Sequence, residues 1–163
     1  MNDALRARVI TEALEWIGTP YVDHARVKGR NGGADCLTFI AGVYESAGVI
    51  DRLAIPHYAH DWHLHSDDEH YLNGKDGGPG MLHFCEEIEG PPLPADIAMW
   101  KFGLSFSHSS IVIKWPLIIH TVRNRGVGRD DAERRTILRM IHENIPERGQ
   151  PRPRKFFRVK GWT

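Results

Sequence analysis

The cysteine at position 36 has the sequence setting of a nucleophile. Cys36 follows Asp35, a plausible N-cap, and the apolar residues after it recur at helical spacing as far as Gly48. A helix N-terminus carries partial positive charge and unpaired N–H groups, which stabilise a thiolate and can donate to an oxyanion. We therefore expect the Cys36 thiol to have a pKa below that of a free thiol. The alternative is a small buried hydrophobic residue on an amphipathic helix.

A thiol nucleophile needs a base, and two histidines on neighbouring predicted strands are candidates. His108 begins a β-branched run over residues 108–115, and His120 lies near the end of a strand over 117–122. The break at Pro116 predicts that the two strands pair as a hairpin. A histidine at a strand end can face an open cleft. The alternative is that both histidines make ordinary hydrogen bonds within the sheet.

The remaining elements indicate how these residues are positioned. Helices come first and strands follow, which is typical of an α+β fold, and the length suits a single domain over residues 1–163. Asp3 is the expected N-cap of the first helix, and residues 51–95 give no clear pattern except one helix. The predicted elements are helices over 3–17, 36–47, 66–73 and 130–145, loops over 18–34 and 103–107, and strands over 96–102, 108–115, 117–122, 126–129 and 156–159.

Composition excludes several classes of protein. The 21 basic and 21 acidic residues give zero net charge, which argues against a general nucleic-acid binder. No apolar run has the length of a membrane span, so we expect no membrane insertion. The first residues lack the pattern of a signal peptide, so we expect synthesis in a cytoplasm without a leader. The two cysteines are too few for a disulfide scaffold, and we interpret Cys85 as structural or incidental.

Five short segments, in this order, resemble the NlpC/p60 cell-wall peptidases, a circularly rearranged branch of the papain-like cysteine peptidases. They are residues 16–21 (WIGTPY), 35–37 (DCL), 94–98 (PADIA), 107–112 (SHSSIV) and 118–120 (IIH). The resemblance implies a papain-like, NlpC-type α+β fold, in which N-terminal helices pack on a central antiparallel β-sheet.

The resemblance also implies a role for each matching residue. Cys36 would be the nucleophile, His108 the base that takes its proton, and His120 the group that orients His108. Tyr21 would place a hydroxyl near the nucleophile or the oxyanion. No cofactor or metal is implied. We add Asp35, together with two arginines of the loop described below, as candidate substrate-binding residues.

The sequence departs from the family pattern at three places. Thr38 stands where many relatives have a small residue and could crowd the helix. Ser109 follows His108 where an apolar residue is common, and Ala95 precedes Asp96 where glycine is usual. None of these departures removes a catalytic group.

Residues 58–65 and 115–120 resemble most closely the branch of tailed phages and phage-like particles. The expected protein is a cysteine endopeptidase that hydrolyses peptidoglycan stem peptides. The resemblance implies that it cleaves the D-glutamyl–diaminopimelate bond. It would be a virion tail component acting in the bacterial periplasm, with other tail proteins as partners. The alternatives are a structural tail-tip protein that keeps the fold without hydrolysis, and an acyltransferase or amidase on the same scaffold.

Other charged features have two interpretations each. Arg26 and Arg30 could attract substrate carboxylates, or could belong to a solvated loop. The histidines over 57–83 could bind a metal, although no metal-binding motif supports this, so we expect an ordinary structural segment. The basic stretch over 148–160 could bind nucleic acid, but a charged edge strand explains it more simply.

Overall fold

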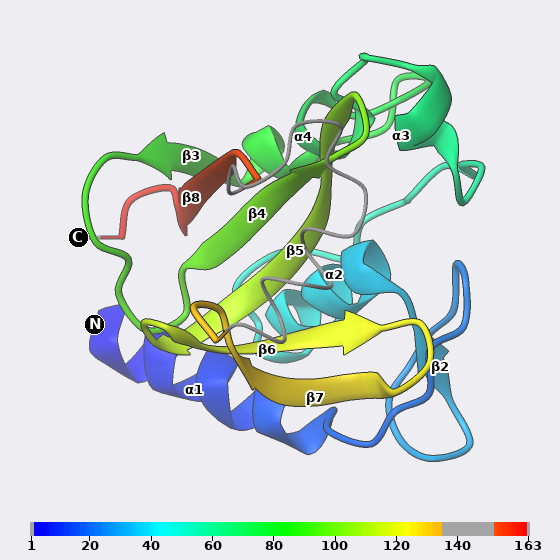
Figure 1. Ribbon diagram of the computed structural model, residues 1–163. Helices are drawn as coiled ribbons and strands as arrows, with labels where there is room; N and C mark the ends of the chain where they lie inside the picture. The colour runs from blue at the N-terminus through cyan, green and yellow to red at the C-terminus, as the bar shows by residue number, and fades with distance from the viewer. Residues whose placement is uncertain (1, 135–151, 163) are drawn as a thin grey trace.

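The centre of the protein is a six-stranded antiparallel sheet (Figure 1). The computed structural model describes residues 2–134 and 152–162. In spatial order the strands are β3 (Cys85–Ile88), β8 (Arg154–Val159), β4 (Ile97–Phe102), β5 (Ser105–Lys114), β6 (Leu117–Val122) and β7 (Gly126–Asp131). The helices precede most of the strands along the chain, which confirms the expected α+β class.

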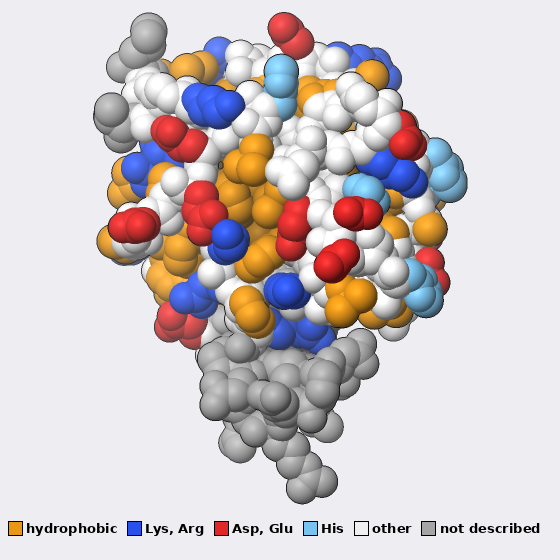
Figure 2. Space-filling view, turned by 90° about the horizontal axis from the view of Figure 1, so that it is seen from above, with side chains coloured by type: hydrophobic (Ala, Val, Ile, Leu, Met, Phe, Trp, Pro, Cys, Tyr) orange, Lys and Arg blue, Asp and Glu red, His pale blue; other side chains and the backbone are white. Residues whose placement is uncertain are grey.

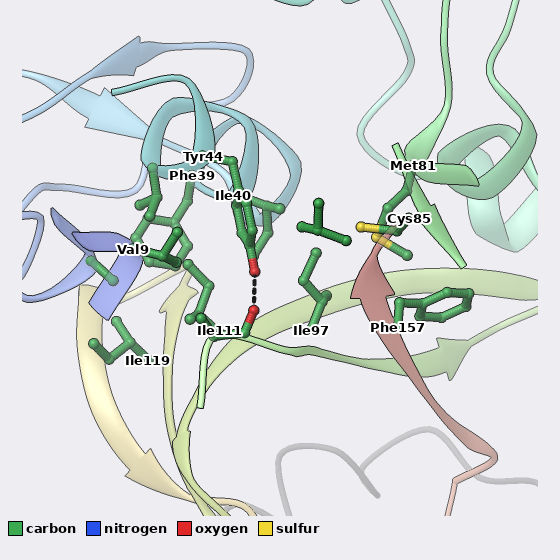
Figure 3. Packing of buried hydrophobic residues seen from close by; sticks show 14 of the residues in the cluster. Val9, Phe39, Ile40, Tyr44, Met81, Cys85, Ile97, Ile111, Ile119 and Phe157 are labelled. Carbon is green, nitrogen blue, oxygen red and sulfur yellow. Dashed lines mark hydrogen bonds between the residues drawn. The ribbon is translucent and has the colours of Figure 1, made fainter. Parts of the chain in front are cut away.

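The two main helices, α1 (Asn2–Glu15) and α2 (Cys36–Ser46), pack on one face of this sheet. Val9 of α1 and Phe39 of α2 are fully buried against Ile111 and other residues of the strands (Figure 3). The hydroxyl of Tyr44 crosses this core and donates to the carbonyl of Ala95 at 2.6 Å. This packing fixes α2 over β5 and therefore fixes where its N-terminus points. No helix in the described ranges is long and apolar enough to cross a bilayer.

Side chains of the opposite face form a second, smaller cluster. Successive side chains of a strand alternate between the two faces, so Val112 and Ile118 lie on this second face while Ile111 and Ile119 belong to the first. Trp100 and Ala98 of β4 complete the second cluster. The sheet is therefore covered by apolar side chains on both faces.

Asp96 connects three elements at the edge of the core. Its carboxylate has no exposed surface and accepts from Arg6 of α1 at 2.9 Å and from Arg158 of β8 at 2.7 Å. A buried carboxylate is stable only when its lone pairs are satisfied in this way. The preceding Ala95 has a φ of 65°, in the left-handed region that favours glycine. The departure from the family pattern at Ala95 therefore falls at a position with a backbone preference for glycine.

The first half of the chain differs from expectation in two places. The helix over 3–17 is confirmed as α1, but it begins one residue earlier, so Asp3 lies in its first turn rather than at its N-cap, and it ends at Glu15, after which residues 16–18 form a turn. The helix over 66–73 is confirmed only over its last four residues, α4 (His70–Asn73); a second short helix, α3 (Trp62–His65), ends before an extended Ser66. Ser66 exchanges hydrogen bonds with Asp68, and such local side-chain bonds compete with helix formation.

The predicted loop over 18–34 contains a small hairpin, and the unclear segment contains a strand. The hairpin pairs β1 (Arg26–Val27) with β2 (Gly33–Ala34). A short 3-10 helix (Met81–His83) leads into β3, on which Cys85 is almost completely buried. Cys85 therefore has the structural position expected of it.

The strands of the second half are confirmed with corrected limits. The hairpin of β5 and β6 turns at Trp115-Pro116 as predicted, but β5 begins at Ser105, inside the expected connection. The predicted helix over 130–145 is wrong at its start, because residues 130 and 131 pair with β6 and residues 132–134 form a turn; residues 135–145 lie outside the described residues. The final strand is not an edge strand, since β3 pairs with it on its outer side.

Candidate active site

The start of α2 is determined by a reciprocal cap. The Asp35 carboxylate accepts from the backbone N–H groups of Leu37 at 3.0 Å and Thr38 at 2.9 Å. The Thr38 hydroxyl in turn accepts from the backbone N–H of Asp35 at 2.9 Å. This capping box makes Cys36 the first residue of the helix, as predicted. Thr38 does not crowd the helix, because its side chain is part of the cap.

The same carboxylate attaches two other segments to the helix. Its second oxygen accepts from the backbone N–H of His24 at 2.8 Å and from the Tyr58 hydroxyl at 2.5 Å. Asp35 is 3% exposed, and both of its oxygens have partners within the protein. Asp35 therefore positions Cys36, the preceding loop and the segment around Tyr58, and this network occupies the carboxylate that we expected to bind substrate.

The sulfur of Cys36 lies where the ladder between β5 and β6 stops. The pairing of these strands ends at Ser110 opposite His120, and Ser107 is the unpaired residue of a β-bulge against β4. The thiol donates to the Ser107 carbonyl at 3.3 Å, and the backbone N–H of Ser109 donates to the sulfur. The backbone groups that β6 leaves unpaired are thus used to hold the nucleophile beside β5. Bulges often re-aim residues next to active sites in this way.

Polar side chains also anchor the backbone of Cys36. The Ser109 hydroxyl donates to the Cys36 carbonyl at 3.1 Å and shares a 2.5 Å hydrogen bond with the hydroxyl of Tyr71 on α4. Both side chains are buried. The unusual serine after His108 therefore has a structural use, and Tyr71, which we did not anticipate, gives α4 a direct contact with the site.

All four predicted catalytic residues open onto one cavity of about 560 Å³. Cys36 and His108 are both half-buried, so the cavity reaches the sulfur and the imidazole. One wall comes from the segment before α4, which contributes aromatic and histidine side chains. The cavity is lined by Tyr21, Asp35, Cys36, Leu37, Tyr58, His60, Trp62, His63, Tyr71, Phe102, Ser107, His108, His120, Thr121, Val122 and Arg123.

Behind the cavity, three side chains form a hydrogen-bonded series. Nε2 of His108 lies 2.9 Å from Nδ1 of His120, and Nε2 of His120 lies 2.7 Å from Oδ2 of Asp130. Arg125 pairs with the same carboxylate oxygen. The expected contact between the two histidines is present. Asp130 was missed because it fell in a segment interpreted as the start of a helix.

The electrostatics of the sulfur reverse our expectation. Burial, reinforced by the neighbouring Asp35 charge, raises the pKa of the Cys36 thiol to about 12, although backbone N–H groups act in the opposite direction. Burial and the nearby His120 and Arg152 lower the pKa of His108 to about 3. The positive end of the helix is therefore outweighed by desolvation. In the resting protein the thiol and the imidazole are both neutral near pH 7.

Tyr21 stands on the cavity wall opposite the strands. Its hydroxyl donates to Asp23 at 2.9 Å and lies 3.2 Å from Nδ1 of His60. Burial, followed by the charge of a Cys36 thiolate, raises the pKa of Tyr21. The hydroxyl is therefore protonated throughout the ordinary pH range, and its hydrogen is donated to Asp23.

The two predicted substrate-binding arginines lie outside this cavity. Arg26 pairs with Glu45 of α2 at 2.6 Å and donates to the Leu53 carbonyl, which gives it a structural role. Arg30 is exposed on the turn between β1 and β2. Within residues 2–134 and 152–162, no three metal-ligating side chains converge on one point. Figure 2 shows acidic and basic side chains interspersed over one face, without a continuous basic surface.

Comparison with solved structures identifies the fold. No family model matches the sequence, and no curated protein matches it. The NlpC/p60 domain of the peptidoglycan hydrolase SagA is similar with a TM-score of 0.52 and 19% identity, over 78% of this chain and 90% of that one. The peptidoglycan hydrolase RipB from Mycobacterium tuberculosis has a TM-score of 0.57 and 12% identity, over 97% of this chain and 66% of that one. NlpC1 from Trichomonas vaginalis has a TM-score of 0.55 and 15% identity, over 96% of this chain and 44% of that one.

The fold is that of the NlpC/p60 proteins. This confirms the fold that the sequence resemblance implied. At these identities the similarity extends to the fold alone, and the chain spans less than half of NlpC1.

The hydrogen bonds of Asp35 lead to a prediction about the stability of the protein. Replacing Asp35 with alanine should lower the free energy of unfolding by about 2–4 kcal/mol, because a cap is lost and the hydroxyl of the half-buried Tyr58 and the His24 N–H lose their acceptor. Denaturant unfolding followed by circular dichroism measures this. Asp51→Ala, at an exposed aspartate, is the matched control and should change stability by less than about 0.5 kcal/mol. Equal stability of the two variants would contradict the role given to Asp35.

The raised pKa of Cys36 leads to a prediction about the reactivity of its thiol. The thiolate is the reactive form, so with a pKa of about 12 the alkylation rate should rise about tenfold for each pH unit between pH 7 and 9.5, without a plateau. Iodoacetamide labelling followed by peptide mass spectrometry, in a Cys85→Ala background, gives the rate at Cys36. A small free thiol should level off near its ordinary pKa of about 8.5. A plateau for Cys36 below pH 8 would show a preformed thiolate and contradict the prediction.

Proposed function

We propose that this protein is a cysteine peptidase that hydrolyses peptide bonds in peptidoglycan stem peptides. The observation that carries the proposal is the single cavity onto which Cys36, His108 and His120 all open, in a chain with the NlpC/p60 fold. SagA and RipB, which share this fold, are peptidoglycan hydrolases. The cavity has the volume of a small-molecule or short-peptide site.

The proposed reaction begins from a neutral pair. Nδ1 of His108, the ring nitrogen not engaged by His120, takes the proton of the Cys36 thiol as the sulfur attacks the substrate carbonyl carbon. The carbon–nitrogen bond then breaks, and the His108 imidazolium gives its proton to the leaving amine. Water, deprotonated by the same imidazole, attacks the thioester and releases the acid, which restores the thiol.

Hydrogen-bond donors for the oxyanion of this reaction lie at the cavity. The N–H groups of Leu37 and Thr38 are used by the Asp35 cap, so the N–H of Cys36, which lies at the nucleophile, is the donor that α2 would supply. The protonated Tyr21 hydroxyl lines the same cavity, and it would donate to the oxyanion once it turns away from Asp23. These groups would stabilise the negative charge that develops on the carbonyl oxygen.

The finer features of the proposal rest on the sequence resemblance. The D-glutamyl–diaminopimelate bond is the proposed cleavage site, and the tail of a phage or phage-like particle is the proposed location, with other tail proteins as partners. Residues 58–65, which carry part of this resemblance, include Tyr58, His60 and His63 of the cavity wall. The same segment would therefore contact the substrate.

Digestion of defined muropeptides tests the reaction. Cys36→Ala should lower the cleavage rate by about 10³-fold or more, because no other described side chain of the cavity can replace the sulfur. Cys85→Ala is the matched control, since it removes the other cysteine of the chain from a buried position without touching the cavity, and it should keep nearly full activity. Product masses identify the bond and separate hydrolysis from acyl transfer. A Cys36→Ala variant as active as the wild type would refute the mechanism, and an inactive wild type would favour the structural alternative.

The proposed location has its own test. Particles purified from a producing culture should contain this chain at a fixed ratio to the tail proteins, measured by quantitative mass spectrometry. Proteins that only adhere to particles should be removed by a salt wash, whereas a tail component should stay. Loss of the chain on washing, or its recovery only in the soluble fraction, would contradict a place in the tail.

A further inference from the structure

The series behind the cavity runs diagonally across three neighbouring strands. Ser110 of β5 lies opposite His120, so His108 is the diagonal neighbour of His120 two residues away. Gly128 of β7 lies opposite His120 on the other side, so Asp130 is again the diagonal neighbour. Side chains at such diagonal positions lie on the same face of the sheet, and long or aromatic side chains can contact each other across this distance.

The guanidinium of Arg125 lies against the glycine opposite His120. A Cβ at Gly128 would approach Nε of Arg125 to 3.4 Å, so the guanidinium lies over the glycine. Nε2 of His120 then has two possible partners, the Asp130 carboxylate at 2.7 Å and Nη2 of Arg125 at 3.2 Å. A carboxylate only accepts hydrogen bonds and a guanidinium only donates them. The two neighbours therefore favour opposite protonation states of the same ring nitrogen.

The shorter contact decides where the protons lie. With Asp130 as its partner, Nε2 of His120 carries the hydrogen and Nδ1 is an acceptor. Nδ1 of His120 then accepts from Nε2–H of His108, at 2.9 Å. Nδ1 of His108 is consequently left without a hydrogen, which is the state needed to take a proton from a thiol. With Arg125 as the partner, each of these assignments reverses and Nδ1 of His108 carries a hydrogen.

The charge state of the carboxylate is consistent with this assignment. Partial burial alone would raise the pKa of Asp130, but hydrogen bonds from His120 and Arg125 lower it to about 2. Asp130 is therefore an acceptor at any pH at which the protein would work. Burial keeps His108 neutral over the same range. The charged groups that interact with the two rings are Arg125, Asp130 and Arg152. The other titratable or charged side chains that line the same cavity are Tyr21, Asp35, Cys36, Tyr58, His60, His63, Tyr71 and Arg123.

We propose that Asp130 is a positioning residue that sets the tautomers of both histidines, so that Nδ1 of His108 is free to act as the base. This inference rests on the proposed function for its kinetic consequence, but not for the tautomers themselves. Arg125 has a secondary part, because it holds the carboxylate in place while competing for the same nitrogen. Asp130 acts through His120 and does not contact the substrate.

Nitrogen-15 spectra of the histidine rings test the tautomers without substrate. At pH 7.5 the wild type should show hydrogen on Nε2 of both His108 and His120, assigned by comparison with His108→Gln and His120→Gln. In Asp130→Asn, the amide can donate to Nε2 of His120, so both rings should shift to the Nδ1–H tautomer. Asp131→Asn, the same change at the next residue of β7, is the matched control and should keep the wild-type tautomers. Hydrogen on Nδ1 of His120 in the wild type, or identical spectra for Asp130→Asn, would overturn the inference.

Kinetics on muropeptides provide the second readout. Asp130→Asn should lower kcat by about 10²–10⁴-fold with KM changed less than about twofold, because the base is in the wrong tautomer while the cavity is intact. Asp130→Glu keeps the acceptor and should recover part of kcat, and Asp131→Asn should match the wild type. If Asp130→Asn does not fold, the wild-type spectrum still tests the tautomers, and Asp130→Glu still tests the effect of the carboxylate on kcat. Wild-type protein with the predicted tautomers but no cleavage would refute the proposed function and leave this inference standing. Unchanged kcat in Asp130→Asn would refute the inference alone.

Discussion

The buried carboxylate of Asp35 is the interaction on which the cavity depends. It caps α2, receives the backbone of His24 and binds the hydroxyl of Tyr58, so three segments that are distant in the sequence meet at one group. A buried acceptor with this many donors can adopt few alternative arrangements, because each lost partner leaves a polar group unsatisfied. The position of Cys36 follows directly, since it is the residue after the cap. The wall of the cavity around Tyr58 follows from the same carboxylate.

The second constraint is the separation of β5 from β6. A complete ladder would use the backbone groups of Ser107 and Ser109 in the sheet, and the sulfur would have no place beside the strand. Because the pairing stops at Ser110, the same groups hold the thiol instead. His108 and His120 lie at this opening and belong to the sheet, while Cys36 belongs to the helix. The opening therefore brings residues of two layers into one cavity.

Burial has an electrostatic consequence for catalysis. A desolvated thiol and a desolvated imidazole both prefer their neutral forms, and the helix N-terminus does not compensate. A neutral pair transfers its proton during the attack rather than before it. The tautomer of His108 then becomes decisive, because a neutral imidazole can accept a proton at only one nitrogen. A carboxylate two strands away can influence the base for this reason, through hydrogen bonds alone.

Local sequence was sufficient for the elements whose causes are local. The Asp35 cap, the helical spacing after it, and the β-branched runs around His108 and His120 are short-range patterns, and the structure confirms each of them. The order of the five matching segments was also sufficient to anticipate the fold. The helix predicted over 66–73 was wrong over residues 66–69, where Ser66 and Asp68 bond to each other, and hydrophobic periodicity does not detect such local side-chain bonds.

Only the tertiary structure decided the properties that depend on neighbours in space. β8 lies inside the sheet because β3 pairs with its outer side, and the four residues of β3 show little hydrophobic alternation that would predict a strand. The use of Arg26 in an ion pair with Glu45, and of Asp130 behind His120, depends on partners that are not adjacent in the sequence. The direction of the Cys36 pKa was decided by desolvation, which is a property of the packed protein. A sequence pattern identifies the charges and dipoles near a group, but the extent to which water is removed from that group is determined only when the chain has folded around it.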